Sequence, residues 1–146
     1  MKSILITIYL LAAHSISGSA LADSLKIEFT AEDSYSIEVA RIKVGEKVEW
    51  LPTNEGHNVQ FLAGPEKFVV PKESDLNKQY SVVFTVPGVY LYGCTPHWNS
   101  GMLGLVIVGN DLHNIEDIKN IKLSHVATSV LQRLIGIAQS KQGKRL

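Results

Sequence analysis

The sequence predicts an all-β protein, a β-sandwich of short antiparallel strands with two α-helices appended at its C-terminal end. Between residues 25 and 108, apolar and polar residues alternate in short runs that Gly- and Pro-containing turns separate. After Gly109 the apolar residues recur at helical spacing instead. The chain has 146 residues and no internal repeat or linker, which is a suitable length for one domain.

The expected strands follow one another along the chain with turns between them. They lie at residues 25–30, 35–39, 42–44, 48–52, 80–86, 89–93 and 103–108. Trp50 and Phe84 occupy alternating strand positions and are expected in the core. Residues 63–78 contain a glycine and two prolines, so we expect irregular structure there, with one short strand at 68–70.

Two helices are expected after the last strand. The first contains Ile115 and Ile118, with Asn114 as its N-cap and two acidic residues in its first turn. Ser124 is the expected N-cap of the second. The spacing of its apolar residues predicts one buried face. This face consists of Val126, Val130, Leu134 and Ala138, flanked by Leu131 and Ile135.

The N-terminal residues have the pattern of a cleaved secretory signal. A positive charge precedes an apolar run at 4–13, and an Ala-Leu-Ala exit follows at 20–22. A run of about ten residues is too short for a membrane core, which needs roughly 20. We therefore expect removal of residues 1–22, which leaves 23–146 as a single exported domain without a membrane anchor.

Charge and cysteine content narrow the possible functions. Removing residues 1–22 takes away one of the 14 basic residues and none of the 14 acidic ones, so the remaining chain is nearly neutral. A neutral chain gives no electrostatic reason to expect nucleic-acid or anionic-lipid binding. Cys94 is the single cysteine, so it forms no intramolecular disulfide and is either an inert buried thiol or a reactive or ligating one.

The residues from Cys94 to Met102 place three potential metal donors in nine positions. His97 lies between the thiol and the thioether, and the segment joins two expected strands. A loop tethered at both ends directs its side chains toward one point. A second imidazole must come from elsewhere, and His57 in residues 54–58 is the candidate.

This donor set indicates copper. Two imidazoles, one thiolate and a weak thioether form the trigonal His₂Cys set with axial Met that suits type I, or blue, copper. Zinc sites prefer additional Cys or His, and a catalytic zinc needs an open position. Cys, His and Met are common structural residues singly, but the complete set at this spacing predicts a metal site of His57, Cys94, His97 and Met102.

At these residues the chain resembles the cupredoxins, and most of all the pseudoazurins. The Cys-Thr-Pro-His-x₄-Met loop and the upstream Gly-His-Asn-Val at 56–59 match that family. The resemblance implies a cupredoxin-like Greek-key β-sandwich with two C-terminal α-helices. It also implies that the Asn58 backbone N–H donates to the Cys94 sulfur while its side chain binds Thr95.

The resemblance further implies a periplasmic electron carrier that binds one copper ion and is not an enzyme. Its expected partners are redox proteins, such as c-type cytochromes and a copper-containing nitrite reductase, that dock transiently near His97 and Trp98. The expected state is monomeric. Trp98 itself has two interpretations, a core anchor or part of the docking face.

The chain also departs from the pseudoazurin pattern. Glu55 and Gly93 stand where relatives usually carry lysines around the exposed histidine, which leaves Lys67 and Lys122 as possible members of that ring. The alternatives within copper proteins are a plastocyanin- or amicyanin-like carrier for another donor–acceptor pair, and a copper chaperone. A hydrolase with a Cys94–His97 pair is a third, which leaves Met102 unexplained.

Overall fold

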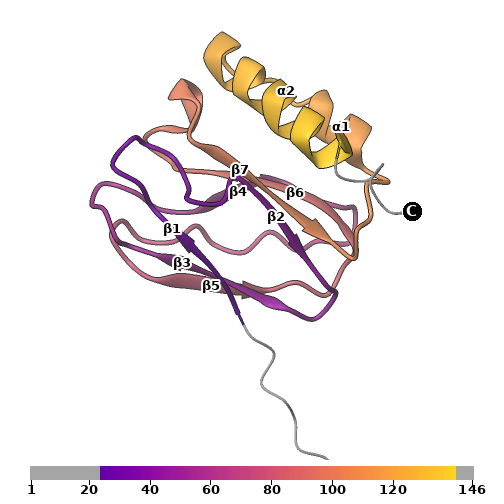
Figure 1. The fold of residues 1–146 in the computed structure, drawn as a ribbon, viewed down its shortest axis with the longest axis horizontal. Coiled ribbons are helices and arrows are strands. Elements are labelled where there is room, and N and C mark those ends of the chain that lie inside the picture. The colour runs from indigo at the N-terminus through magenta and orange to yellow at the C-terminus, as the bar shows by residue number, and fades with distance from the viewer. Residues whose placement is uncertain (1–23, 141–146) are drawn as a thin grey trace, which may run out of the picture.

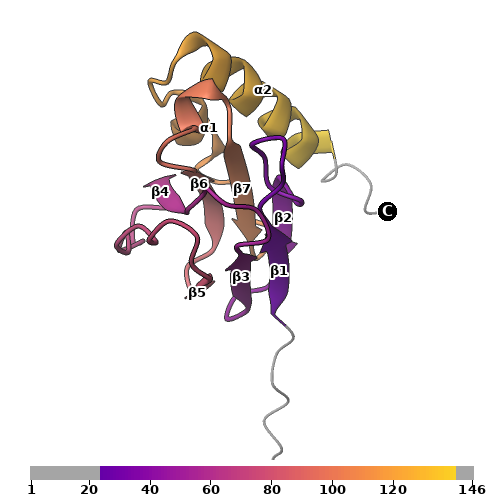
Figure 2. The same ribbon diagram turned by 90° about the vertical axis from the view of Figure 1, so that its left-hand side faces the viewer.

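In the computed structural model, which describes residues 24–140, two β-sheets face each other and two helices cover the outer side of one of them (Figures 1 and 2). One sheet has the order β1-β3-β5 and the other β2-β7-β6-β4. The strands are β1 Leu25–Glu28, β2 Val39–Ile42, β3 Lys47–Leu51, β4 Gln60–Ala63, β5 Tyr80–Val83, β6 Gly88–Gly93 and β7 Leu103–Val108. The helices are α1 Ile115–Lys119 and α2 His125–Ser140, with a 3₁₀ turn η1 at Trp98–Ser100. The expected β-sandwich with two C-terminal helices is confirmed.

The sheets are mixed, whereas the sequence predicts antiparallel strands. β1 pairs with β3 in parallel, and so does β2 with β7. The remaining pairs, β3–β5, β4–β6 and β6–β7, are antiparallel. β1 and β3 are neighbours in one sheet, but β2, which lies between them in the sequence, belongs to the other sheet. The chain therefore crosses between the sheets twice before β3 begins.

β6 and β7 are buried on both of their faces, which explains their continuous apolar sequences. One face of β7 contributes Val106 and Val108 to the core between the sheets. The other contributes Leu105 and Ile107 to a second core beneath the helices. The metal loop joins these two strands, so it starts and ends on the most buried part of the fold.

Aromatic rings fill the core between the sheets. Trp50 is fully buried and its ring centre lies 5.1 Å from that of Tyr92 in an edge-on arrangement. Phe61 lies 6.0 Å from Tyr92, and Phe84 is 1% exposed. The core positions expected for Trp50 and Phe84 are confirmed.

Both helices begin at the expected residues, but their caps differ. The Ser124 hydroxyl oxygen accepts a hydrogen bond from the Ala127 N–H at 3.1 Å, as an N-cap does. Asn114 occupies the N-cap position of α1 without a side-chain cap bond. Its amide instead exchanges two 2.8 Å hydrogen bonds with the backbone of Val89, which ties α1 to β6.

The buried face of α2 is rotated from the expected one. The buried residues are Ala127, Leu131, Leu134, Ile135 and Ala138. Val126 is 53% exposed, although its spacing predicts a position on this face. The small Ala127 is fully buried in its place.

Several strand limits also differ from expectation. β4 was missed, and residues 68–70 form no strand, so the short strand expected there is wrong. Residues 35–39 are reduced to a single bridge between Phe29 and Tyr35 before β2 starts. The Ser36 hydroxyl accepts the Glu28 N–H at 2.8 Å, which occupies a backbone group that a longer strand pair would use.

Within residues 24–140, no helix combines the length and apolar character that crossing a membrane requires. The expected signal at 1–22 lies outside the described residues.

Candidate metal centre

The segment from Cys94 to Met102 is a loop closed by its own backbone. Gly93 and Leu103 pair at the ends of β6 and β7, so the loop has a fixed base. The Cys94 N–H donates to the Met102 carbonyl at 3.2 Å, and the Met102 N–H donates to the His97 carbonyl at 3.1 Å. The donors are therefore held by main-chain hydrogen bonds as well as by side-chain packing.

The loop contains two positions that only glycine fills easily. Gly101 adopts φ 108°, and an added Cβ would lie 2.9 Å from Val130 on α2. Gly93 is buried, and an added Cβ would lie 2.7 Å from the Cβ of Trp98. A lysine at Gly93 would displace Trp98, so the missing member of the lysine ring follows from packing in this chain.

His57 comes from the loop between β3 and β4 and is 3% exposed. Its carbonyl accepts the Asn77 N–H at 2.9 Å, and the Asn77 side-chain oxygen accepts the Gly56 N–H at 2.5 Å. The Phe29 ring packs edge-on against the imidazole, with centres 5.8 Å apart. Segments distant in sequence therefore fix this histidine on two sides.

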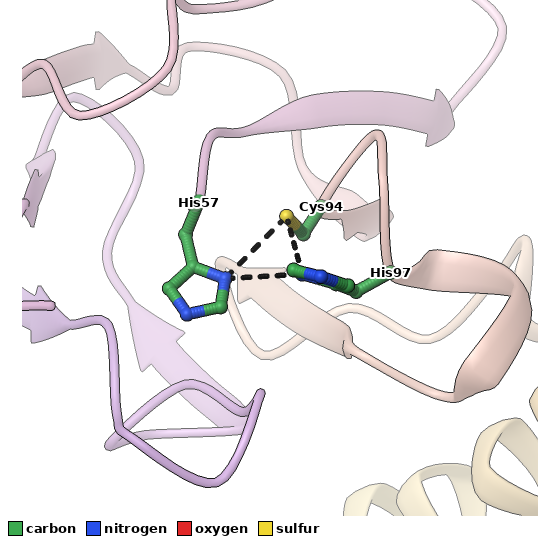
Figure 3. Close-up of side chains that lie close together, drawn as sticks. All are labelled: His57, Cys94 and His97. Carbon is green, nitrogen blue, oxygen red and sulfur yellow. Dashed lines mark hydrogen bonds between the residues drawn. The ribbon is translucent and has the colours of Figure 1, made fainter. Parts of the chain in front are cut away.

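The structure brings His57, Cys94 and His97 together, as Figure 3 shows. The Cys94 sulfur lies 3.7 Å from Nδ1 of His57 and 3.5 Å from Nδ1 of His97. The two Nδ1 atoms are 3.2 Å apart. Met102 is 1% exposed and belongs to the same core cluster as Cys94.

This triangle has the dimensions of a metal site. A point equidistant from the three donor atoms lies about 2.0 Å from each, close to the roughly 2.0–2.3 Å bonds that imidazole and thiolate make to a transition metal. One thiolate and two imidazoles beside a buried thioether match the donors of type I copper. The residues present fit a copper ion.

Asn58 ties the histidine segment to the cysteine loop. Its side-chain oxygen accepts the Thr95 N–H at 2.7 Å, and its NH₂ group donates to the Thr95 hydroxyl at 2.9 Å and to the Ser74 carbonyl at 3.1 Å. The Asn58 backbone N–H also acts on the Cys94 thiol, whose pKa it lowers. The contact of the Asn58 side chain with Thr95 that the pseudoazurin resemblance implied is present. The hydrogen bond of its backbone N–H to the sulfur stays a prediction.

Burial dominates the acid–base chemistry of the metal-free site. Desolvation raises the pKa of the Cys94 thiol, although backbone N–H groups of Asn58 and His97 act in the opposite direction. Desolvation also lowers the pKa of His57, with the nearby His97 as the second cause. A metal ion is the natural stabiliser of a thiolate in this setting, because it replaces the lost solvation.

A carboxylate that no sequence motif indicates also faces the site. Oδ1 of Asp33 lies 3.6 Å from Nε2 of His57 and 3.9 Å from Nδ1 of His97. Its charge opposes the lowering of the His57 pKa. Asp33 is 24 residues from His57 in sequence and belongs to no motif, so nothing in the sequence pattern pointed to it.

The two histidines differ in exposure. The side chain of His97 is 29% exposed, compared with 4% for His57. Pro96 is exposed beside His97, and Trp98 is half-buried against the core beneath the helices. Trp98 is therefore partly a core anchor, and its role in a docking face stays a prediction.

Comparison with known proteins agrees with this chemistry. The model of the family of copper binding proteins, plastocyanin/azurin, matches residues 22–109. A pseudoazurin of Methylorubrum extorquens is 34% identical over 106 residues, which cover 69% of each chain. A putative pseudoazurin of Rhizobium leguminosarum is 39% identical over 87 residues, which cover 59% of this chain and 57% of that relative.

Solved structures extend the likeness to the whole sandwich and its helices. A Sinorhizobium pseudoazurin superposes with a TM-score of 0.74 at 28% identity, covering 80% of this chain and 97% of that one. The pseudoazurin of Methylobacterium extorquens AM1 gives 0.72 at 27% identity, with 79% and 98% covered. The chain thus belongs to the plastocyanin/azurin family of copper-binding proteins, as a cupredoxin of the pseudoazurin type.

Proposed function

We propose that this protein is a type I copper electron carrier in which His57, Cys94, His97 and Met102 hold the metal. The observation that carries the proposal is the triangle of one sulfur and two Nδ1 atoms, with sides between 3.2 and 3.7 Å. Bound copper would supply a one-electron couple, Cu(II)/Cu(I), at this point. The proposed ligand set combines this triangle with the buried thioether of Met102.

The protein's part is to keep the donors in one arrangement for both oxidation states. Main-chain hydrogen bonds close the Cys94–Met102 loop, and Asn58 links that loop to His57. A donor set held in this way moves little when an electron arrives or leaves. Small rearrangement favours fast electron transfer, and a weak axial thioether tunes the potential.

The cysteine is unsuited to hydrolysis. Cys94 is fully buried, and desolvation raises the pKa of its thiol. A nucleophilic cysteine instead needs partial exposure and a lowered pKa. These properties favour a carrier over an enzyme with a Cys94–His97 pair.

His97 is the proposed route for electrons between copper and partner, because its side chain is the exposed member of the donor set. Redox proteins would dock on the surface around Pro96, His97 and Trp98. Candidate partners are c-type cytochromes and a copper-containing nitrite reductase. Electron-transfer complexes are small and short-lived, so this limited surface is sufficient.

The proposed location is the periplasm, after removal of residues 1–22. The pattern of charge, short apolar run and Ala-x-Ala exit supports it. Expression of the full chain in a Gram-negative host, followed by N-terminal sequencing of the periplasmic fraction, tests this. A product starting at Asp23 supports export, and one retaining Met1 contradicts it.

The proposed copper site is tested by the visible spectrum of the copper-loaded protein. A Cys94 thiolate bound to Cu(II) in this geometry gives an intense orange-red absorption band that ascorbate bleaches, because the copper–sulfur bond is highly covalent. A pale complex with ordinary hyperfine splitting in electron spin resonance would contradict the proposal.

A further inference from the structure

A short hairpin covers the His57 side of the donor set. Phe29 and Tyr35 form a bridge at its base, and the Thr30 N–H donates to the Ser34 carbonyl at 2.9 Å across the turn. The hydroxyl groups of Thr30 and Ser34 are 2.6 Å apart and reinforce this closure. Asp33 lies in the turn with φ 50°, a left-handed conformation that Asp tolerates better than most residues.

The base of this hairpin is attached to the metal site itself. Phe29 packs edge-on against the His57 ring. The Tyr35 hydroxyl donates to the carbonyl of Asn58 at 3.1 Å, and Tyr35 is 2% exposed. Because both ends of the turn are anchored on the residues around His57, Asp33 has a defined position relative to that histidine.

His57 and Asp33 can form a donor–acceptor pair once a metal is bound. If His57 ligates through Nδ1, its Nε2 carries a hydrogen and requires an acceptor. The Asp33 carboxylate faces that nitrogen at 3.6 Å. A closer approach of a few tenths of an ångström would turn this contact into a charge-assisted hydrogen bond.

We propose that Asp33 is a positioning residue for the copper site, which accepts a hydrogen bond from the Nε2–H of His57 and lowers the reduction potential of the metal. The inference rests on the proposed copper-binding function. The potential falls because a negative charge near the metal stabilises Cu(II), the more positive state, over Cu(I).

The size of the effect is limited by solvent. The Asp33 side chain is 59% exposed, so water and salt screen its charge. The carboxylate nevertheless lies within 3.9 Å of both imidazoles. We expect its charge to shift the Cu(II)/Cu(I) equilibrium by about tenfold, which for a one-electron couple is about 59 mV.

The test compares three variants by redox titration of the visible band. Asp33→Asn keeps an acceptor oxygen and the left-handed turn but removes the charge, so its potential should rise by the expected amount. Asp33→Gly also tolerates the turn and removes the acceptor as well. Glu32→Gln is the matched control, since Glu32 is exposed on the same turn and loses the same charge. Its potential should change less than that of Asp33→Asn.

A second measurement follows the hydrogen bond. In the reduced protein, proton NMR should show faster solvent exchange of the His57 Nε2–H in Asp33→Gly than in the parent or in Asp33→Asn. A shift for Asp33→Asn no larger than for Glu32→Gln would overturn the electrostatic role, and unchanged exchange in Asp33→Gly would overturn the hydrogen bond. A parent protein without the orange-red band would overturn the proposed function itself, so the two failures are distinguishable.

Discussion

His57 and His97 present their Nδ1 atoms 3.7 and 3.5 Å from the Cys94 sulfur, yet they belong to different kinds of structure. The segment around His57 is buried and is fixed by contacts with residues distant in sequence, such as Phe29. His97 lies on a loop that bonds mainly to itself, and its side chain is 29% exposed. Under the proposed function, the buried half, which is the segment around His57 together with Met102, sets the properties of the metal. The exposed half, which is Pro96, His97 and Trp98, delivers the electron.

Cys94 lies between the two halves, so its loss should have the largest effect. Cys94→Ser replaces a covalent thiolate donor by a hydroxyl, and we expect the orange-red band to disappear completely. Visible spectroscopy of the copper-loaded variant is the measurement. His113→Ala, at an exposed histidine outside the site, should keep the full colour. A band that survived in Cys94→Ser would remove the thiolate from the copper site.

The buried half should be the more sensitive to side-chain truncation. Asn58→Ala deletes three hydrogen bonds and leaves the Thr95 N–H and the Ser74 carbonyl without a partner. We expect a loss of about 3 kcal/mol in the free energy of unfolding of the metal-free protein, measured with urea.

The matched control for this truncation is Asn120→Ala, which removes one exposed hydrogen bond to the Glu116 carbonyl on α1. Its effect should be within about 0.5 kcal/mol. Equal losses for the two variants would contradict the special role given to the contact between the histidine segment and the cysteine loop.

Met102 tests whether the buried half tunes the potential. Met102→Leu conserves volume in the core and removes only the thioether, so the fold and the thiolate band should remain. Met102→Gln offers a harder oxygen donor that favours Cu(II), so its potential should fall below that of Met102→Leu. Redox titration checks the order. Identical potentials in the parent and both variants would show that Met102 is not the axial ligand.

The difference between the halves also explains what the sequence could predict. The loop from Cys94 to Met102 has three of the four proposed donors within nine residues, and β7 is a continuous apolar run. The sequence alone therefore predicts both the metal loop and this strand. The residues that complete the buried half come from separate segments. Their positions depend on how the sheets pack, which local patterns do not encode.

Asp33 and β4 illustrate that limit. Asp33 reaches His57 only because the turn closed by Thr30 and Ser34 places it there in a left-handed conformation. β4 has the short sequence Gln-Phe-Leu-Ala, which shows no alternation, and its pairing with β6 specifies it as a strand. The rotated face of α2 has a similar cause, because contact with the sheet decides which of several apolar stripes is buried.

Substitutions in the exposed half should change the rate of electron transfer but not the visible spectrum. Trp98→Ala removes the half-buried ring beside His97, and we expect electron transfer to a partner to slow several-fold at every ionic strength, because aromatic contacts at the centre of an interface dominate its stability. The visible spectrum should be nearly unchanged. Stopped-flow oxidation of the reduced protein measures the rate, with Val69→Ala, at an 87% exposed valine, as the control. A Trp98→Ala variant as fast as the parent would move the docking surface elsewhere.

The smallest expected effect concerns the charge around this docking surface. Glu55 is exposed two residues before His57, and Gly93 leaves no room for a lysine, so the surface has little of the basic ring that pseudoazurins usually carry. Steered association weakens steeply as salt rises, whereas association through an apolar patch changes little. We therefore expect a shallow salt dependence for electron transfer to an acidic partner. Glu55→Lys should raise the rate at low salt and steepen the dependence. Glu116→Lys, at an exposed position on α1 beside the start of β6, should do so less, because Cys94 follows the other end of that strand. A steep dependence in the parent would show that other basic residues, such as Lys122, already steer the partner.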